Sequence, residues 1–537
     1  MAKALMIQGT GSGAGKSVIV AGLCRIFRDM GIKVAPFKAQ NMALNSFITK
    51  EGGEIGRAQA FQAEAAGIEP SNDMNPVLLK ATGEAGCQVI LNGKVHASMK
   101  AQEYYSIKDK VWEVITAAYD RLSKQYDLIV IEGAGSPAEI NLTREDVVNM
   151  RMARYADAPV ILVGDIDKGG VFAAFYGTVE LLKNPPLPPF AKVGNTPLTP
   201  LDRGELSDAD YIKGFIVNKF RGDMDILRPG LRMIEHKTGK LVIGTLYHQP
   251  DLRLDEEDGL SLERRSAFSV QRSAFKTIKV VVLRLKYISN FTDFAPFLHE
   301  PDIELKYSLR EDDIQNADLI IIPGSKNTVS DLLLLRESGI EACVKSAAEK
   351  DIPLAGICGG YQMLGKKIYD PHGVESGHKE IAGFGLLDIE TTYDKAKTTC
   401  QVEGEIVQSL ELGVKSDKNS LKGYEIHMGQ TTGDIGLFRI NRLNGSNGLN
   451  RSISDGSIKG NVWGTYIHGI FDNDEFRTAL LNSLRERKGL QSQSGFNYQA
   501  EKEEAINKWA DVLKSSVDIC FMLRQVGMEH CITKGKL

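Results

Sequence analysis

The hydrophobic residues of this chain gather in short continuous runs, and amphipathic segments of helical length separate these runs. Six runs occupy the first half of the chain: KALMIQ, GIKVAPF, YDLIVIEG, APVILVGD, IKGFIVNKF and KLVIGTL. An apolar run of this length without polar alternation is typical of a strand buried on both faces, as in a parallel sheet covered by helices. The pattern therefore predicts a doubly wound parallel α/β domain over residues 1–248.

A second series of apolar runs, IKVVVLRL, ADLIIIPGS, IPLAGIC and NVWGTYIHG, predicts a second doubly wound α/β domain over residues 277–485. The proline-rich stretch 185–210 interrupts the first domain and is expected to be a surface loop. Residues 249–276 are polar and charged and are expected to link the two domains. The remaining segment, 486–537, is expected to form a helical and mostly solvated tail.

Composition and charge narrow the function classes. The 537 residues are 42% hydrophobic and 25% charged, an ordinary globular balance. With 65 basic and 69 acidic residues the formal net charge is −4, so no basic field would attract nucleic acid or anionic lipid. No apolar segment approaches the roughly 20 residues needed to span a bilayer, and nothing near the start is typical of a signal peptide. The seven scattered cysteines form no CxxC pair, which favours reduced thiols in the cytoplasm over disulfides or a zinc site. The oligomeric state is left open.

The segment MIQGTGSGAGKSVIVAGLCRIFRDMG predicts a strand, a glycine-rich turn and a helix. It matches a phosphate-binding loop, in which backbone N–H groups and the helix N-terminus cradle phosphates. Lys16 would reach the β- and γ-phosphate oxygens of ATP, and Ser17 would ligate Mg²⁺. The candidate nucleotide-binding residues are Gly9, Thr10, Gly11, Gly13, Gly15, Lys16 and Ser17.

Two further features refine this interpretation. Gly9 lies six residues before Gly15 rather than five, and this longer loop resembles that of dethiobiotin synthetase-type enzymes. Partitioning ATPases of the ParA and MinD type carry a lysine early in the loop, where this chain has Gly11. The strand YDLIVIEG ends in Glu132, and a carboxylate at this sheet edge beside the phosphate loop would hold Mg²⁺ together with Ser17.

The stretch LAGICGGYQMLG fits the pattern G-x-C-x-G, a nucleophile elbow in which a strand turns sharply into a helix. The elbow would expose Cys358 as a nucleophile, and the start of the following helix favours its thiolate. The N–H of Gly359, with backbone around Gly324, would stabilise an oxyanion. His468, which follows an apolar strand, is the favoured proton carrier, and His427 is its main competitor.

GICGGYQMLG together with GTYIHGIF resembles the triad-type (class I) glutamine amidotransferases. The resemblance implies that Cys358 attacks the side-chain amide of glutamine and that ammonia leaves from a glutamyl thioester. It also makes Gln362 a candidate glutamine-binding residue. Most members of that family carry a glutamate two residues after the histidine, but Ile470 stands there in this chain. The usual third member is therefore missing, and Glu425 is a weak candidate to orient His468.

Several further segments resemble one family closely, the cobyric acid synthases: PFKAQNMALNS, EIGRAQAFQAEAAGIEPSNDMNPVLLKATGEAGCQVILNGK, VNKFRGD, ISNFTDFAPF, IIPGSKNTVSDL and GYEIHMG. The resemblance covers residues 1–485 apart from 185–210. It implies an ATP-dependent, glutamine-hydrolysing ligase that amidates the b, d, e and g carboxylates of adenosylcobyrinic acid a,c-diamide through acyl phosphates.

The first two of these segments fit a corrinoid site, because they bring amide and cationic side chains near the phosphate loop. The candidate substrate-binding residues are Lys38, Gln40, Asn41, Asn45 and Arg57, with Gln59 and Gln62 nearby. The sister enzyme, cobyrinic acid a,c-diamide synthase, tends to carry aspartates in the first segment, which favours the four-amide enzyme here. That sister activity is one alternative, and a nucleotide-switched binding protein with an inert amidotransferase half is another.

Overall fold

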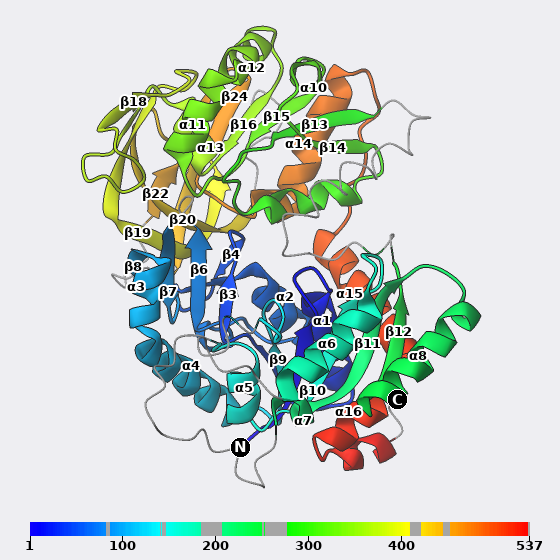
Figure 1. Ribbon diagram of the computed structural model, residues 1–537. Helices are drawn as coiled ribbons and strands as arrows, with labels where there is room; N and C mark the ends of the chain where they lie inside the picture. The colour runs from blue at the N-terminus through cyan, green and yellow to red at the C-terminus, as the bar shows by residue number, and fades with distance from the viewer. Residues whose placement is uncertain are drawn as a thin grey trace.

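The computed structural model describes residues 1–81, 86–139, 141, 146–183, 207–249, 252, 277–408, 420–443 and 452–534. The chain forms two lobes (Figure 1): the first half of the sequence builds the lower one, residues 277–487 build the upper one, and the C-terminal helices lie in the lower one again. Most of the expected loop at 185–210 and almost all of the expected linker at 249–276 lie outside the described residues. Within the described residues, no helix is both long and apolar enough to cross a membrane.

The lower lobe is built on a six-stranded parallel sheet of order β12-β11-β10-β1-β9-β2. It carries the glycine loop that resembles that of dethiobiotin synthetase-type enzymes, and we call it the synthetase domain after that resemblance. Alternate residues of its central strand pack into opposite cores, Leu5 and Ile7 into one and Ala4 and Met6 into the other. Burial on both faces explains the continuous apolar runs of the sequence. The strands are β1 (Lys3–Gly9), β2 (Val34–Phe37), β9 (Leu128–Glu132), β10 (Val160–Asp165), β11 (Ile212–Phe220) and β12 (Leu241–Tyr247).

Helices cover both faces of this sheet, which confirms the doubly wound prediction. The helices on one face are α1 (Lys16–Asp29), α2 (Arg57–Ala66), α15 (Tyr498–Ser516) and α16 (Ile519–Gln525). Those on the other are α4 (Lys108–Ser123), α5 (Met150–Tyr155), α6 (Val171–Lys183) and α8 (Met224–Thr238), and the short helices α3 (Ala101–Ser106) and α7 (Asp208–Tyr211) complete the domain.

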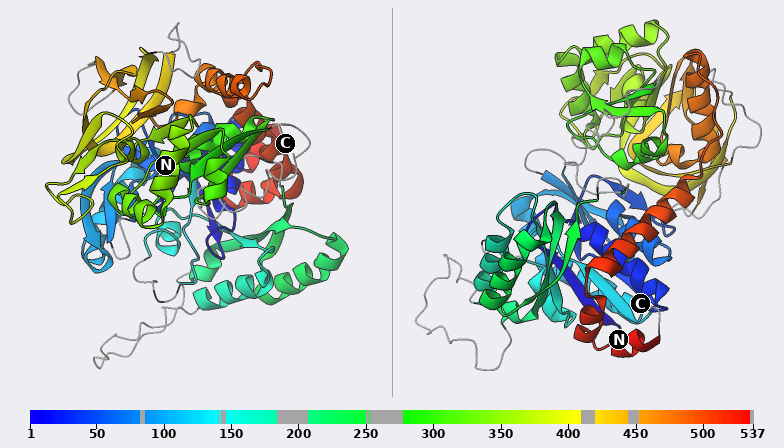
Figure 2. Two further views of the ribbon diagram at one scale, coloured as in Figure 1. Left: turned by 90° about the horizontal axis from the view of Figure 1, so that it is seen from above. Right: turned by 90° about the vertical axis from the view of Figure 1, so that its right-hand side faces the viewer.

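The C-terminal tail is helical as expected, but the expectation that it is mostly solvated is wrong. Ile506, Trp509 and Leu513 recur at helical spacing on α15 and are buried against α1. The indole Nε1 of Trp509 donates a hydrogen bond to the carbonyl of Val18 (2.6 Å), and a Cβ on Gly22 would lie 2.2 Å from the side chain of Leu513. The tail therefore returns from the upper lobe and packs on the helix that follows the glycine loop (Figure 2).

The upper lobe is built on a six-stranded sheet of order β14-β13-β15-β16-β24-β23, parallel except for the edge strand β23. It carries the segments that resemble the glutamine amidotransferases, and we call it the amidotransferase domain after that resemblance. The predicted apolar runs form its central strands. Its strands are β13 (Ile278–Leu283), β14 (Ile303–Ser308), β15 (Leu319–Ile322), β16 (Leu354–Ile357), β23 (Ser457–Lys459) and β24 (Val462–Thr465). Its helices are α10 (Glu311–Gln315), α11 (Thr328–Glu337), α12 (Ile340–Glu349), α13 (Gly359–Leu364), α14 (Asp474–Arg487) and the 3₁₀ segments η4 (Phe291–His299) and η5 (Ile470–Asp472).

Smaller sheets, which the sequence pattern did not predict, complete both lobes, and some of their strands lie where the lobes meet (Figure 1). In the upper lobe they comprise β17 (Lys367–Tyr369), β18 (Glu380–Ala382), β19 (Ile389–Ile406), β20 (Ser420–Gly433), β21 (Phe438–Leu443) and β22 (Ser452–Asp455). In the lower lobe they comprise β3 (Gln40–Met42), β4 (Ser46–Ile48), β5 (Glu54–Gly56), β6 (Val77–Ala81), β7 (Gly86–Leu91) and β8 (Lys94–Lys100).

A buried ion-pair cluster joins these sheets across the two domains. The carboxylate of Glu54 on β5 accepts from the ammonium of Lys80 (2.8 Å) and from that of Lys397 on β19 (2.5 Å). Lys397 also donates to the side-chain oxygen of Gln88 (3.2 Å). Removing one partner of a buried ion pair leaves an uncompensated charge, so this cluster favours one relative placement of the domains.

Candidate active sites

The glycine loop of the synthetase domain has the backbone that its sequence demands. Gly13 (φ 72°) and Gly15 (φ 95°) adopt left-handed conformations that favour glycine. A Cβ on Gly9 would lie 2.9 Å from the ammonium nitrogen of Lys16, so a larger residue would crowd that lysine. Lys16 opens α1, and its ammonium donates to the carbonyls of Gly11 (3.0 Å) and Gly135 (3.3 Å). The ammonium thus lies across the mouth of the loop, where phosphates would bind.

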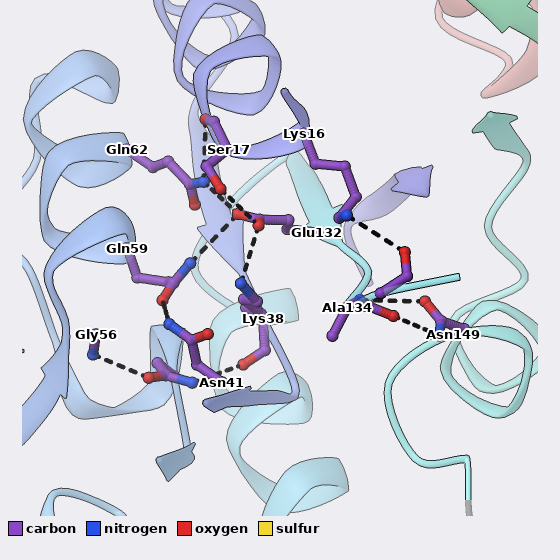
Figure 3. Close-up of polar contacts among 12 residues, drawn as sticks. Lys16, Ser17, Lys38, Asn41, Gly56, Gln59, Gln62, Glu132, Ala134 and Asn149 are labelled. Atoms are coloured by element: carbon purple, nitrogen blue, oxygen red, sulfur yellow. Dashed lines mark hydrogen bonds and ion pairs between the residues drawn. The ribbon is translucent and has the colours of Figure 1, made fainter. Parts of the chain in front are cut away.

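The carboxylate of Glu132, at the end of β9, collects hydrogen-bond donors from three segments (Figure 3). Oε1 accepts from the hydroxyl of Ser17 (2.8 Å) and the ammonium of Lys38 (3.0 Å). Oε2 accepts from the amides of Gln59 (3.3 Å) and Gln62 (2.5 Å). Burial raises the pKa of Glu132. The Lys38 charge and the hydrogen bonds from Gln62 and Lys38 lower it by more than burial raises it, so the pKa lies below its ordinary value.

Oxygen atoms suited to Mg²⁺ meet at this point. The hydroxyl of Ser17 and the carboxylate of Glu132 are in direct contact. The side-chain oxygen of Gln62 is buried and has no hydrogen-bond partner among the described residues. Hard divalent cations prefer such hydroxyl, carboxylate and amide oxygens, so the donor set fits Mg²⁺. In the described part of the chain no group of three or more His, Cys, Asp or Glu side chains makes an alternative metal site.

Two of the five candidate corrinoid contacts lie near Glu132. Lys38 binds it directly, and the Asn41 amide donates to the oxygen of Gln59 (2.9 Å), as Figure 3 shows. Gln40, next along β3, accepts a hydrogen bond from the hydroxyl of Tyr104.

The other two candidates point toward the domain interface. Arg57 opens α2, and its guanidinium lies 5.4 Å from the centre of the Phe47 ring. Asn45 is 1% exposed, and its side-chain oxygen accepts from the backbone N–H of Phe291 in the other domain (3.0 Å).

Cys358 occupies a strained corner between β16 and α13. Its backbone has φ 52° and ψ −105°, an unfavourable conformation for a residue with a side chain. A Cβ on Gly360 would lie 1.9 Å from the carbonyl oxygen of Ile322, so the turn leaves room only for glycine there. The thiol is 7% exposed and lies 3.6 Å from the carbonyl of Ile426. This is the geometry of a nucleophile elbow.

His468 lies against this thiol and is held from its other side by Asp293. Its Nδ1 is 2.7 Å from Oδ2 of Asp293, whose Oδ1 accepts from the N–H of Gly469 (3.1 Å). Burial lowers the pKa of His468, but the Asp293 charge and hydrogen bonds to Asp293 and Cys358 outweigh it and raise the pKa to about 10. A Cβ on Gly324 would lie 3.2 Å from Cε1 of His468, so that glycine backs the imidazole.

The sequence candidates for orienting His468 and for replacing it lie elsewhere. The carboxylate of Glu425 is hydrogen-bonded to Nε2 of His427 (3.2 Å) and forms an ion pair with Arg442 (2.5 Å). The prediction that Glu425 orients His468 is therefore wrong. The other ring nitrogen of His427 contacts the carbonyl of Gly429 (2.7 Å). With both ring nitrogens engaged, His427 is a member of a buried network rather than a proton carrier.

Asp293 is the residue that the sequence reasoning missed. It stands in ISNFTDFAPF, a segment singled out only by resemblance, and lies 175 residues before His468.

The remaining predicted residues surround the thiol. Gly359 starts α13 directly after Cys358. The amide of Gln362 accepts from the hydroxyl of Tyr393 (3.0 Å) and donates to that of Tyr466 (3.1 Å), which ties it into the wall of the site.

Comparisons with known proteins agree with both halves of this description. Residues 5–262 match the CobQ/CobB/MinD/ParA nucleotide binding domain, and residues 279–476 match the CobB/CobQ-like glutamine amidotransferase domain. The chain is 48% identical to a cobyric acid synthase of Thermodesulfovibrio yellowstonii over 97% of this chain and 98% of that protein. It is 46% identical to one of Syntrophobacter fumaroxidans (98% and 99%) and 43% identical to one of Clostridium botulinum (98% and 100%).

Proposed function

The chain belongs to the cobyric acid synthase family, and from this premise we propose that it amidates the b, d, e and g carboxylates of adenosylcobyrinic acid a,c-diamide. In the synthetase domain, each substrate carboxylate attacks the γ-phosphorus of ATP, and ADP leaves. Ammonia then attacks the carbonyl carbon of the acyl phosphate and displaces phosphate. Ammonium ion is not a nucleophile, and only the small unprotonated fraction of dissolved ammonium can react, so glutamine hydrolysis within the same protein would supply the ammonia more effectively.

The phosphate-binding side chains have separate tasks in this scheme. Lys16 lies over the glycine loop and would stabilise negative charge on the transferred phosphoryl group. Ser17 and Glu132 would hold Mg²⁺, which supplies further charge neutralisation when bound. Lys38, Gln40, Asn41 and Arg57 are the proposed corrinoid contacts, with Asn45 at the interface end of the same segment.

In the amidotransferase domain, the thiolate of Cys358 attacks the amide carbon of glutamine. The N–H of Gly359 and backbone near Gly324 stabilise the oxyanion. The protonated imidazole of His468 gives its Nε2 proton to the departing ammonia, and the neutral ring then activates the water that hydrolyses the thioester to glutamate. Asp293 keeps the ring in one orientation and stabilises its charged form.

One observation carries the proposal: a strained, flanked cysteine contacts a histidine whose far nitrogen is held by a buried aspartate. The same chain holds a complete phosphate-binding loop, which a stand-alone glutaminase would not need. The alternative of an inert amidotransferase half does not account for this arrangement.

The test is product mass after incubation with ATP, Mg²⁺, glutamine and the a,c-diamide. We expect the final product to have gained four amides. Activity only on cobyrinic acid, with two amides gained, would instead identify the sister a,c-diamide synthase. Nucleotide hydrolysis without any amide product would favour the nucleotide-switched binding protein.

A further inference from the structure

The histidine of the glutaminase site lies beside the domain interface, where a strand of the synthetase domain meets β20 (Figure 1). Three groups form a closed set of hydrogen bonds there. The amide of Asn290 donates to the carbonyl of Ser46 (3.2 Å) and to the hydroxyl of Tyr424 (2.9 Å). That hydroxyl donates in turn to the same Ser46 carbonyl (3.1 Å). All three residues are buried, so water cannot replace the hydrogen bonds that a shift of Ser46 would break.

Tyr424 connects this set of bonds to the catalytic imidazole in two ways. Its ring is stacked on that of His468, with centroids 5.3 Å apart and planes 18° from parallel. Its backbone N–H donates to the carbonyl of His468 (3.2 Å), and the N–H of His468 donates to the carbonyl of Tyr424 (2.9 Å). A movement of Tyr424 therefore moves His468 relative to Cys358.

On its other side, Tyr424 reaches the proposed corrinoid site. The Phe47 ring lies 5.5 Å from the Tyr424 ring, and the guanidinium of Arg57 lies over Phe47. The backbone N–H of Arg57 donates to the carbonyl of Asn45 (3.2 Å). Arg57 opens α2, the helix whose glutamines bind Glu132 beside the phosphate loop. Packed side chains thus connect His468 to Arg57, and helix α2 connects Arg57 to the glutamines at Glu132.

We propose that Tyr424 is a positioning residue that makes glutamine hydrolysis respond to occupancy of the synthetase site. This inference rests on the proposed function. ATP and a corrinoid carboxylate bound near Arg57 hold segment 45–57 in one arrangement, and Ser46, Phe47 and Tyr424 transmit it to the imidazole. Ammonia is then released when an acyl phosphate can capture it. Coupling of this kind is typically worth about 5–150-fold between two sites.

The direct test is Tyr424→Phe, which keeps the stacked ring and removes the hydroxyl that binds Ser46 and Asn290. Glutamate release is measured with and without ATP plus a,c-diamide, and amidation is measured with ammonium. We expect wild-type glutamate release to rise about 5-fold or more when both ligands are added. In Tyr424→Phe the rise falls below about 2-fold, while ammonium-supported amidation stays within about 2-fold of wild type.

Matched variants separate coupling from folding. Asn290→Gly removes the amide yet tolerates the left-handed backbone at that position (φ 52°), and we expect the same loss of stimulation. If Tyr424→Phe does not fold, the Asn290→Gly variant tests the same inference. Tyr369→Phe removes a hydroxyl that bonds Glu390 in the same domain (3.2 Å) and should keep wild-type stimulation.

Several results would overturn the inference. One such result is wild-type glutamate release that does not change when ATP and the a,c-diamide are added. Another is full stimulation of glutamate release in both Tyr424→Phe and Asn290→Gly. Failure of the proposed function looks different, because wild type would then make no amide from either nitrogen source. The linkage also predicts a binding readout. In Cys358→Ser, bound glutamine should tighten binding of the a,c-diamide, the a,c-diamide should tighten binding of glutamine by the same factor, and adding Tyr424→Phe should abolish both effects.

Discussion

The two active sites differ in how far each depends on the other domain. Around Glu132, the donors Ser17, Lys38, Gln59 and Gln62 all come from the synthetase domain. Around His468, Asp293 and Cys358 come from the amidotransferase domain, but the neighbouring Tyr424 is hydrogen-bonded to the synthetase domain. The cluster around Glu132 is therefore assembled from one domain, whereas the surroundings of His468 are bonded to the other domain through Tyr424.

The sites also use charge in opposite directions. At Glu132, lysines and amides stabilise a carboxylate and lower its pKa in spite of burial. At His468, a buried aspartate stabilises an imidazolium and raises its pKa. On the proposed function, the first arrangement would hold cations and phosphates, and the second would hold a proton beside the sulfur of Cys358. The following predictions test this division.

The largest effect is expected from Cys358→Ser. Without the thiolate nucleophile, glutamine-dependent amidation should fall by about 10⁴-fold or more, while ammonium-dependent amidation persists because the synthetase site is untouched. Amide product is measured by mass with each nitrogen source. Cys520→Ser, in the tail, is the matched control and should leave both activities intact. Loss of both activities in Cys358→Ser would show that the sites are not separate.

Lys16→Ala should act on the opposite domain. Loss of the ammonium over the glycine loop should lower amidation by about 10³-fold with either nitrogen source, because both need the same activated carboxylate. Unstimulated glutamate release should remain. Parallel assays of glutamate and amide check this, and residual ammonium-dependent synthesis at the wild-type rate would contradict the proposed role of Lys16.

Asp293→Asn should lower glutamate release by about 10²-fold, less than removal of the thiolate, because the nucleophile remains. Its pH profile should also change. Asp293 raises the pKa of His468 to about 10, so the imidazolium of wild type persists into alkaline solution. Without the charge, that form is lost at lower pH, and the alkaline limb should move toward the ordinary histidine value near 6.5. Asp312→Asn, at an exposed site in the same domain, should leave the profile unchanged. An unshifted limb in Asp293→Asn would show that Asp293 does not set the charge of His468.

The smallest effect concerns the tail. Trp509→Phe removes the hydrogen bond to Val18 and part of the contact with α1, and should destabilise the synthetase domain by about 1 kcal/mol. Denaturant unfolding checks this, with unstimulated glutamate release as the control that should not change. A midpoint equal to wild type would mean that the tail contributes little to this domain.

The apolar runs of the sequence by themselves determined the strands of the two main sheets. A strand that is buried on both faces must be apolar at every position, and this composition can be recognised without knowing which segments pack against it. The glycine loop and the cysteine elbow could also be recognised from short stretches of sequence, since a strained turn needs glycine at defined positions. Only the tertiary structure decided that Asp293 rather than Glu425 holds His468, that α15 buries Trp509 against α1, and that β4 meets β20. These contacts join residues 175 and 491 positions apart in two of the cases, and no local periodicity encodes which distant polar group fills a buried place.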